Sequence, residues 1–404
     1  MCVATLSITE ENKSILDTGF ESVFKAKPQR YFSAPGRTEI SGNHTDHQHG
    51  CVLAGAVNLD TVAAVRLNGE NVIRIQSKGY PMCEVCLDNL NPVESEINST
   101  PAIVRGVASK FSSLGCKIEG FDAYCESTVL PGSGLSSSAA FEVLVGTIIN
   151  CMFFDCKLTA VEIAQIGQYA ENVFFGKPCG LMDQTASSVG SMVFIDFEDS
   201  DKPIVEKIEF DFASTGHSLC IIDTGADHAD LTDEYAAVPG ELKSLCRFFG
   251  KEYLRQIPEA DFYANIEKLR KAVGDRAVLR AMHVYDENKR VLSQKEALIK
   301  GDFGLFLSYV SKSGLSSWRY LQNVVPAGRK EKQEVALSLA IVEKLLNGRG
   351  ACRVHGGGFA GTIQAFVPND MLLEFKKGIE AVLGDGSCYV LSIRPQGGVE
   401  MIAE

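Results

Sequence analysis

The sequence lacks the features that mark partners of nucleic acids or membranes. Its net charge is −12 and no basic stripe offsets it, which argues against nucleic acid as a partner. Any polyanionic ligand must therefore be small and bound by a local site. No apolar run approaches the roughly 20 residues that a membrane span needs, so we expect no membrane contact.

Paired metal-binding cysteines and a signal peptide are also missing. Of the 13 cysteines, Cys83 and Cys86 form a Cys-x-x-Cys pair within a strand-like stretch, and a zinc knuckle would need a second such pair. An odd number of cysteines without a signal peptide fits reduced thiols. We therefore expect a cytoplasmic location.

Two familiar nucleotide-binding motifs are absent. Neither Gly176-Lys177 nor Gly250-Lys251 completes a Walker-type phosphate loop. The run Gly356–Gly361 matches Gly-x-Gly-x-x-Gly, but a dinucleotide fingerprint must open a helix, and the strand-like Thr362–Val367 follows. A glycine hinge between two strands, where the backbone approaches a ligand, is the better interpretation.

What remains is the composition of a globular protein long enough for two domains. The chain has 404 residues, 45% of them hydrophobic. Strands and helices alternate irregularly, and the strand–strand–helix–strand pattern over 351–393 predicts an α+β layer with helices on one face. The acidic run 198–202 suggests a boundary, giving domains 1–200 and 201–404.

The stretch Pro131–Ala140 reads Pro-Gly-Ser-Gly-Leu-Ser-Ser-Ser-Ala-Ala and leads into an apolar helix predicted over 137–153. Its glycines let a ligand approach the backbone. Unpaired N–H groups at a helix start, with the positive end of the helix dipole behind them, can bind phosphate. The alternative is an ordinary Gly/Ser turn that caps the helix.

Thirteen residues from Arg37 to His49 concentrate polar side chains between strand-like segments. His44, His47 and His49 could bind zinc, although no Cys or HExxH partner accompanies them. Such a loop can also be merely solvated, or can offer the many donors and acceptors that a hydroxyl-rich ligand needs.

Asp183, in the turn-prone loop 176–184, and Glu171, on a helix predicted over 159–174, are both ordinary surface acids when read alone. They become candidate site residues only because the same chain carries a possible phosphate-binding loop.

Several separated motifs together resemble the galactokinase family of the GHMP small-molecule kinases. They are Pro35-Gly-Arg with His44-Thr-Asp46, Pro131–Ala140, Cys179-Gly-Leu-Met-Asp-Gln184, the helix His283–Asn288, and Gly356–Gly361. The resemblance runs in order from about residue 30 to the C-terminus. It implies a two-domain α+β architecture: an N-terminal domain with a mixed sheet, a ferredoxin-like C-terminal α+β domain, and an active site in the cleft between them.

The resemblance also implies ATP- and Mg²⁺-dependent phosphorylation of galactose at its anomeric hydroxyl. Asp183 would orient or accept the hydroxyl proton, and Arg37 would keep Asp183 ionised and offset charge during phosphoryl transfer. Ser138 and Glu171 match the Mg²⁺ positions. The positions expected to contact the sugar are Asn43, His44, Asp46, Gly180 and Tyr235. Those expected to bind the nucleotide are Gly132, Gly134, Leu135, Ser136, Ser137, Ser138 and Gly357.

The first motif departs from the family pattern, because Glu39 and Asn43 stand where the family has Asn and Glu, as if exchanged. The family glutamate accepts hydrogen bonds near the C6 hydroxyl of the sugar. An uncharged Asn43 would no longer repel an anionic or altered C6, so galacturonate or N-acetylgalactosamine become candidate substrates, unless Glu39 reaches into the same space. His47 and Ala360 replace the usual Tyr and Gly. A catalytically silent sugar sensor is a further alternative, but it would be favoured by loss of Ser138 or Asp183, and both are present. The oligomeric state is not readable from the sequence.

Overall fold

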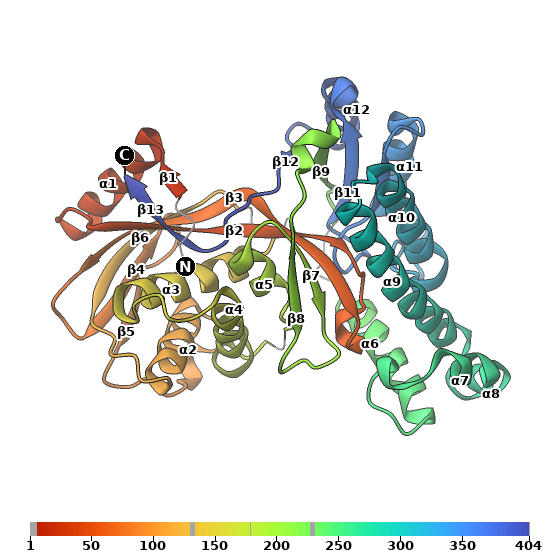
Figure 1. Cartoon of the computed structure of the whole chain (residues 1–404), viewed down its shortest axis with the longest axis horizontal. Coiled ribbons are helices and arrows are strands. Elements are labelled where there is room, and N and C mark those ends of the chain that lie inside the picture. Colours follow the sequence, from red (N-terminus) through yellow and green to blue (C-terminus); the bar gives the residue numbers. More distant parts are fainter. Residues whose placement is uncertain (1–5, 130–133, 178, 227–230, 404) are drawn as a thin grey trace.

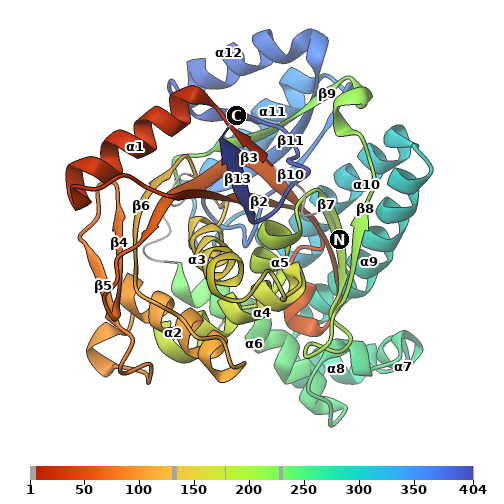
Figure 2. The same ribbon diagram turned by 60° about the vertical axis from the view of Figure 1, so that its left-hand side comes forward.

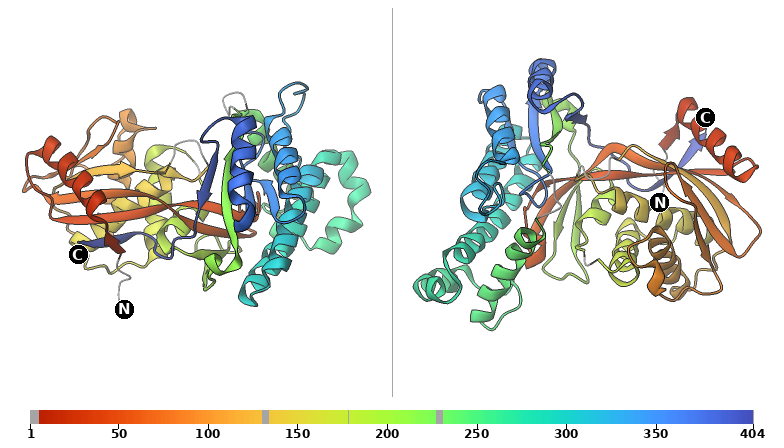
Figure 3. Two further views of the ribbon diagram at one scale, coloured as in Figure 1. Left: turned by 90° about the horizontal axis from the view of Figure 1, so that it is seen from above. Right: turned by 180° about the vertical axis from the view of Figure 1, so that it is seen from behind.

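The computed structural model describes residues 6–129, 134–177, 179–226 and 231–403, which form two β-sheets with helices packed on them (Figure 1). The larger sheet has nine strands and the smaller has four. Most of the larger sheet lies toward one end of the long axis and the helices α9–α11 lie at the other end, where β3 and β8 of that sheet reach α9 (Figure 3). In the described part of the chain, no helix is both long and apolar enough to cross a membrane.

The larger sheet mixes parallel and antiparallel pairs. Its main path runs β1-β13-β2-β3-β6-β4-β5, and β7 and β8 continue from the first part of β3. Pairs β1–β13 and β4–β6 are parallel. The strands are β1 (Leu6–Ile8), β2 (Arg30–Ser41), β3 (Cys51–Leu67), β4 (Val72–Ser77), β5 (Cys83–Cys86), β6 (Phe121–Ser127), β7 (Met192–Asp196), β8 (Ile204–Ile208) and β13 (Val399–Ala403).

Helices cover both faces of this sheet, because its strands alternate apolar side chains between two cores. Phe32, Ala63 and Ala123 face the core under α2–α5, whereas their neighbours in sequence belong to a second core under α1. Figure 2 shows α3 and α5 next to β2. The helices are α1 (Glu10–Phe24), α2 (Thr100–Ser113), α3 (Ser137–Phe153), α4 (Ala160–Tyr169), the π-helical turn η3 (Ala170–Phe175) and α5 (Met182–Val189).

The smaller sheet is antiparallel, in the order β10-β11-β9-β12. Cys220 and Ile222 of β9 face α11 and α12, while Leu219 and Ile221 pack in a core shared with β3 and β7 of the larger sheet. The elements of this part are β9 (His217–Asp223), β10 (Ala351–Val354), β11 (Thr362–Pro368), β12 (Cys388–Leu391), α6 (Thr232–Phe248), α7 (Glu259–Ala264), α8 (Ile266–Val273), α9 (Asp275–Ile299), α10 (Phe303–Ser316), α11 (Glu334–Leu346) and α12 (Leu372–Leu383).

The α+β class and the mixed sheet are confirmed, and several local predictions are corrected. Thr159 and Glu162 form a capping box at the start of α4. The polar segment after Pro35 is not all loop, because β2 continues to Ser41. Residues 51–67 form the single long strand β3. Asp183 lies in the first turn of α5 rather than in a loop. Strands β1, β8 and β13 were not predicted.

The division into domains 1–200 and 201–404 stays a prediction. The chain crosses between the sheets more than once: β8 pairs with β7, and β13 returns from the smaller sheet to pair with β1 and β2.

Candidate active site

A polar cavity of about 210 Å³ lies where the two sheets meet. Strand β2, the turn after it, the start of α5 and the glycine turn after β10 all contribute to its wall. It is smaller than the roughly 300–1,000 Å³ of typical drug-sized pockets, so it fits a small molecule. Its lining residues are Arg37, Glu39, Asn43, His44, Asp46, His47, Cys179, Gly180, Met182, Asp183, Gly356 and Gly357.

Arg37 and Asp183 form a bidentate ion pair in this cavity. Arg37 Nε donates to Asp183 Oδ1 at 2.7 Å, and Nη2 donates to Oδ2 at 2.6 Å. Arg37 also donates to the carbonyl of Gly134 and, at 2.9 Å, to the hydroxyl of Ser136, which itself donates to Asp183. One arginine thus connects strand β2, helix α5 and the start of α3.

The carboxyl group of Asp183 is ionised in this setting. Burial alone would raise its pKa, but the charge and hydrogen bonds of Arg37, together with the Ser136 hydroxyl, outweigh burial and lower the pKa below its usual value. The first turn of a helix also favours a negative charge. Asp183 can therefore accept a hydrogen bond from a substrate hydroxyl at neutral pH.

The start of α3 is arranged as an anion-binding terminus. Ser136, the N-cap residue just before this 17-residue helix, has a left-handed φ of 55°, and its hydroxyl donates to Asp183 instead of capping the helix. The backbone N–H of Arg37 donates to the carbonyl of Leu135 at 3.0 Å, which fixes this terminus against β2. A Cβ at Gly36 would come within 2.9 Å of that same carbonyl, so the close approach requires glycine.

His44 is held as a neutral imidazole at the cavity wall. Burial lowers its pKa to about 4. Its Nε2 lies 3.0 Å from the carbonyl of Gly357, which can only accept, so Nε2 carries the proton. The other ring nitrogen, Nδ1, is therefore a hydrogen-bond acceptor.

Helix α9 fixes the turn that carries Asn43 and His44. His283 Nε2 donates to the carbonyl of Asn43 at 3.0 Å, and one turn later Glu287 accepts the N–H of Gly42 at 3.2 Å. Asn288 then accepts the N–H of Cys51 at 2.9 Å, just after the turn. The sequence places these residues in one motif but gives no sign that they support another.

Glu39 and Asn43 share one end of the cavity. Arg353 on β10, fully buried, donates to Glu39 Oε1 and, at 3.1 Å, to the carbonyl of Ile40. Asn43 Nδ2 donates to the same Glu39 oxygen at 3.2 Å and to the carbonyl of Gly356, while its Oδ1 accepts from Asn323 at 2.7 Å. Glu39 therefore does reach into the space beside Asn43, with the charge of Arg353 next to it.

Tyr235 supports the glycine turn from outside the cavity. Its hydroxyl donates to the carbonyl of Gly358 at 2.7 Å, and a Cβ at Gly357 would meet its ring at 2.8 Å. Gly357, predicted to bind the nucleotide, lines this cavity together with Asn43 and His44. His355, beneath the turn, is neutral because burial lowers its pKa to about 3.

A second cavity, of about 540 Å³, lies on the other side of the start of α3 and has a largely apolar wall. Ser137 and Ser138 of the first turn of α3 line it, next to Tyr80 and Pro81. Its other lining residues are Thr61, Ile75, Ser77, Lys78, Cys83, Thr100, Ile103, Cys125, Glu126, Ser127, Val129, Phe141, Glu142 and Phe175.

Glu142 lines this larger cavity, and a second carboxyl group, that of Glu171, is linked to it through Gln184. Gln184 Nε2 donates to Glu142 Oε2 at 2.9 Å and to Glu171 Oε2 at 3.1 Å. Burial, and then the charge of Glu171, raise the pKa of Glu142 to about 8. Oxygen donors of this kind suit a hard divalent cation, which in kinases is bound by one or two carboxylates together with phosphates. Ser138 lines the same cavity as Glu142, and Glu171 shares the Gln184 amide with Glu142, so the three residues are candidate oxygen ligands of a phosphate-bound Mg²⁺.

The three histidines of the polar segment have different partners. His44 bonds to Gly357 as above, His47 Nε2 lies 3.8 Å from Asp46, and His49 stacks on Tyr253 with ring centroids 3.6 Å apart. Within the described ranges, no group of three or more His, Cys, Asp or Glu residues could hold a metal ion. Gly132, predicted to bind the nucleotide, lies outside the described residues.

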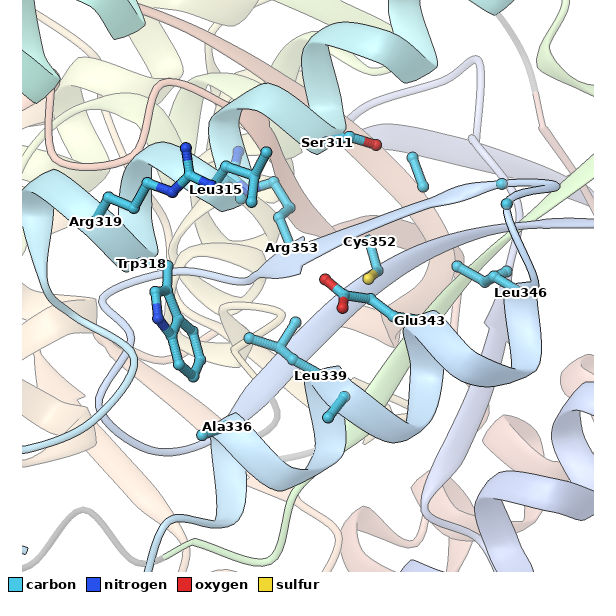
Figure 4. A pocket seen from close by; sticks show the side chains of 15 residues that line it. Ser311, Leu315, Trp318, Arg319, Ala336, Leu339, Glu343, Leu346, Cys352 and Arg353 are labelled. Atoms are coloured by element: carbon cyan, nitrogen blue, oxygen red, sulfur yellow. The ribbon is translucent and has the colours of Figure 1, made fainter.

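A third hollow, of about 590 Å³, is larger than either of these but stands apart from them (Figure 4). It lies between α10 and α11 over β10, with Leu315, Trp318 and Leu339 around it. Arg353 borders it, but the Arg353 guanidinium bonds to Glu39 and Ile40 instead. Size alone therefore does not identify the candidate site.

Comparisons with known proteins assign this chain to a class. Residues 102–191 match the family model "GHMP kinases N terminal domain", and residues 18–67 match "Galactokinase galactose-binding signature". A solved mevalonate kinase shares the fold, with a TM-score of 0.62 at 12% identity over 91% of this chain and all of that one. The fold is that of a GHMP kinase.

More similar proteins specify the family. The galactokinase of Streptomyces coelicolor is 30% identical over 348 residues, which cover 85% of this chain and 86% of that protein. The galactokinase of Actinobacillus pleuropneumoniae is 30% identical over 352 residues, with the same coverage. The solved structure of Lactococcus lactis galactokinase complexed with galactose has a TM-score of 0.79 at 25% identity, and covers 96% of this chain and 99% of that one. The chain belongs to the galactokinase family.

Proposed function

We propose that this protein transfers the γ-phosphoryl group of ATP to the anomeric hydroxyl of galactose, giving galactose 1-phosphate and ADP. The observation that carries this proposal is the Arg37–Asp183–Ser136 cluster, which lies between a small polar cavity and a larger, mostly apolar one. A sugar in the first cavity and a nucleotide in the second would meet at this cluster.

Asp183 is the proposed catalytic acceptor. Because its pKa is lowered, it is a weak base, so its first task is to orient the hydroxyl for in-line attack. It then takes the proton as the new phosphate ester forms. Phosphoryl transfer depends mainly on positioning and electrostatic stabilisation, so a weak, well-placed base is sufficient.

Arg37 and the start of α3 are the proposed sources of positive potential. Arg37 lies against both Asp183 and Ser136, where charge moves from the nucleotide toward the acceptor. The backbone N–H groups of Gly134, Leu135, Ser136, Ser137 and Ser138 are proposed to bind phosphates. Mg²⁺, held by Ser138 and Glu171, would offset charge on the phosphate oxygens.

We propose that the residues of the small cavity recognise the sugar through directional hydrogen bonds rather than through a large contact area. Asp46 supplies acceptors, His44 supplies the acceptor Nδ1, and Gly180 supplies backbone at close range. Asn43 has its amide largely committed to Gly356, Glu39 and Asn323, so we propose that it positions Glu39. Tyr235 and Gly357 are proposed to shape the glycine turn.

The site favours a neutral hexose over an anionic one. Glu39 Oε1 is occupied by Arg353 and Asn43, which leaves its other oxygen to accept from a sugar hydroxyl. A uronate would bring a second carboxylate against Glu39, whereas a hydroxymethyl group would donate to it. The exchange of Glu39 and Asn43 therefore preserves a carboxylate at this end of the cavity.

A sugar panel tests the proposal. ADP release with Mg²⁺-ATP is measured for galactose, N-acetylgalactosamine, galacturonate and glucose, and ³¹P NMR locates the phosphate. We expect the highest kcat/KM with galactose and a phosphate on C1. A higher kcat/KM with another galactose-configured sugar would reassign the substrate, and binding of sugar and ATP without turnover would indicate a sensor.

The redox state of the chain agrees with a cytoplasmic location, which we also propose. The cysteines in the described part of the chain are free thiols, and structural disulfides are the usual pattern in oxidising compartments.

A further inference from the structure

Two buried carboxyl groups face one another across a single amide. Glu142 on α3 is 1% exposed and Glu171 on η3 is 4% exposed. Gln184 Nε2, with two hydrogens, donates to one oxygen of each. Because both oxygens bond to the same nitrogen at 2.9 and 3.1 Å, they lie within about 6 Å of each other.

The remaining oxygens of this cluster are poorly satisfied. Glu142 Oε1 and Gln184 Oε1 are buried and have no hydrogen-bond partner among the described residues. Among the described residues, Lys177 forms an ion pair with this cluster: its Nζ lies 3.5 Å from Glu171 Oε1. The side chain of Lys177 is exposed. An uncompensated buried acceptor costs about 1–3 kcal/mol, and more when it is charged. A group of unpaired oxygens around two acids is suited to a cation.

Glu142 also lies on the face of α3 that carries Ser138. The two residues are four apart, hence neighbours on the helix surface, and both line the larger cavity. Glu171 is carried by a π-helical turn, a feature often found at functional sites. Ser138, Glu142 and Glu171 thus converge from two helical segments, while Gln184 follows the catalytic Asp183 directly.

We propose that Glu142 is a second carboxylate ligand of the nucleotide's divalent cation, opposite Glu171 and held with it by Gln184. This inference rests on the proposed function, because the nucleotide brings the phosphates that complete the coordination of the cation. Two carboxylates, a hydroxyl and phosphate oxygens form an all-oxygen set that suits Mg²⁺ or Mn²⁺. Gln184 keeps the two acids apart and oriented, as outer-shell partners do at metal sites.

The test measures metal binding in the absence of turnover. Mn²⁺ is titrated into the protein saturated with a non-hydrolysable ATP analogue, and free Mn²⁺ is followed by electron paramagnetic resonance. We expect Glu142→Gln to raise the Mn²⁺ dissociation constant at least about tenfold, the scale on which even outer-shell partners act. Affinity for the analogue in EDTA should stay within about twofold of the wild-type value.

A matched control and a second measurement separate ligation from packing. Glu400→Gln removes a carboxyl group on β13 that pairs with Arg30 of β2. Neither residue lines either cavity, so Mn²⁺ affinity should be unchanged. Without metal, the melting temperature of Glu142→Gln should equal or exceed that of the wild type, because the substitution removes a poorly compensated buried acid. When Mn²⁺ and the analogue are added, the melting temperature of the variant should rise less than that of the wild type.

The possible failures are distinguishable. If Glu142→Gln binds Mn²⁺ as tightly as the wild type does, the inference is wrong. If the metal-free melting temperature also drops strongly, Glu142 has a structural role instead. If the wild-type protein itself does not bind Mn²⁺ with the analogue, the proposed function fails first.

Discussion

The two cavities on either side of the start of α3 are built in different ways. The smaller one draws its wall from both sheets, with Arg37 and Asp183 on one side and Gly356 and Gly357 on the other. Its charged groups are committed to one another by hydrogen bonds. Among the residues that the structure describes, the larger one is lined only by residues between Thr61 and Phe175, and most of its wall is apolar.

This difference separates two kinds of recognition. A polar, mutually bonded wall discriminates by direction, because a ligand must replace or complete specific hydrogen bonds. An apolar wall discriminates mainly by shape. Changes in the second half of the chain should therefore affect sugar use and leave nucleotide binding nearly intact, and the following experiments are arranged to challenge that separation.

The largest effect is expected for Asp183→Asn. The amide keeps the shape of the side chain but cannot take the hydroxyl proton, so kcat should fall by about 10²–10⁴-fold, the usual contribution of a positioned acid or base. The dissociation constant of the nucleotide should stay near the wild-type value. Steady-state kinetics and calorimetry measure the two quantities.

Asp196→Asn is the matched control, because Asp196 pairs with Arg255 at 3.0 Å outside both cavities. Near-normal turnover of Asp183→Asn would remove Asp183 as the acceptor of the proton. A loss of nucleotide affinity in the same variant would contradict the proposal that the two cavities bind their ligands independently.

An intermediate effect is expected for the Glu39–Arg353 pair. Arg353→Met leaves the buried carboxylate of Glu39 without its cation, which should cost about 3–5 kcal/mol of unfolding free energy. The double variant Glu39→Gln/Arg353→Met should recover part of that loss, because no buried charge is left unpaired. Urea unfolding of both single variants and the double variant gives the coupling energy.

The same variants test the sugar side. KM for the sugar should rise about tenfold when Glu39 changes, a loss of about 1.4 kcal/mol of binding, while nucleotide affinity is unchanged. Additive unfolding free energies in the cycle would show that the pair is not coupled, contrary to its geometry.

The smallest effect is expected from pH, through His283. Its pKa is lowered to about 4 from an ordinary 6.5, chiefly by burial, so the folded state holds it neutral. The unfolded chain takes up a proton first as pH falls, so the stability that His283 contributes is complete above pH 6.5 and is lost progressively between pH 6.5 and 4.

His283→Gln should therefore reduce the pH dependence of stability in that window by up to about 1.4 kcal/mol per pH unit, the value for one proton. Urea unfolding at pH 7, 6 and 5 measures the slope. His44 and His355, whose pKa values are about 4 and about 3, keep part of the slope in the variant. An unchanged slope would show that His283 is not the group that titrates.

Much of the proposed phosphate-binding part of the site could be predicted from the sequence. The helix predicted over 137–153 has the bounds of α3, because a glycine-rich start and a continuous apolar run mark both ends. The capping box at Thr159 was readable for the same reason: its partners are three residues apart.

The sugar-side half was harder, because its partners are distant in sequence. Arg37 and Glu39 read as loop residues by polarity, but they sit on β2 with counter-charges at Asp183 and Arg353. Local patterns carry no information on pairs separated by 146 or 314 residues. Glu142 was missed for a different reason, since an acid within an apolar helix gives no sign of the Gln184 and Glu171 groups beside it.

The position of β13 determines when, during synthesis, one edge of β2 can become paired. Residues near the C-terminus fill the slot between β1 and β2, pairing with both. While the chain is being made, β2 can pair with β3 early, but its other edge stays open until β13 has been synthesised. The nascent chain therefore exposes an unpaired strand edge, a known route to aggregation, while the long segment between β3 and β13 is made. Pairing with β13 then covers this edge.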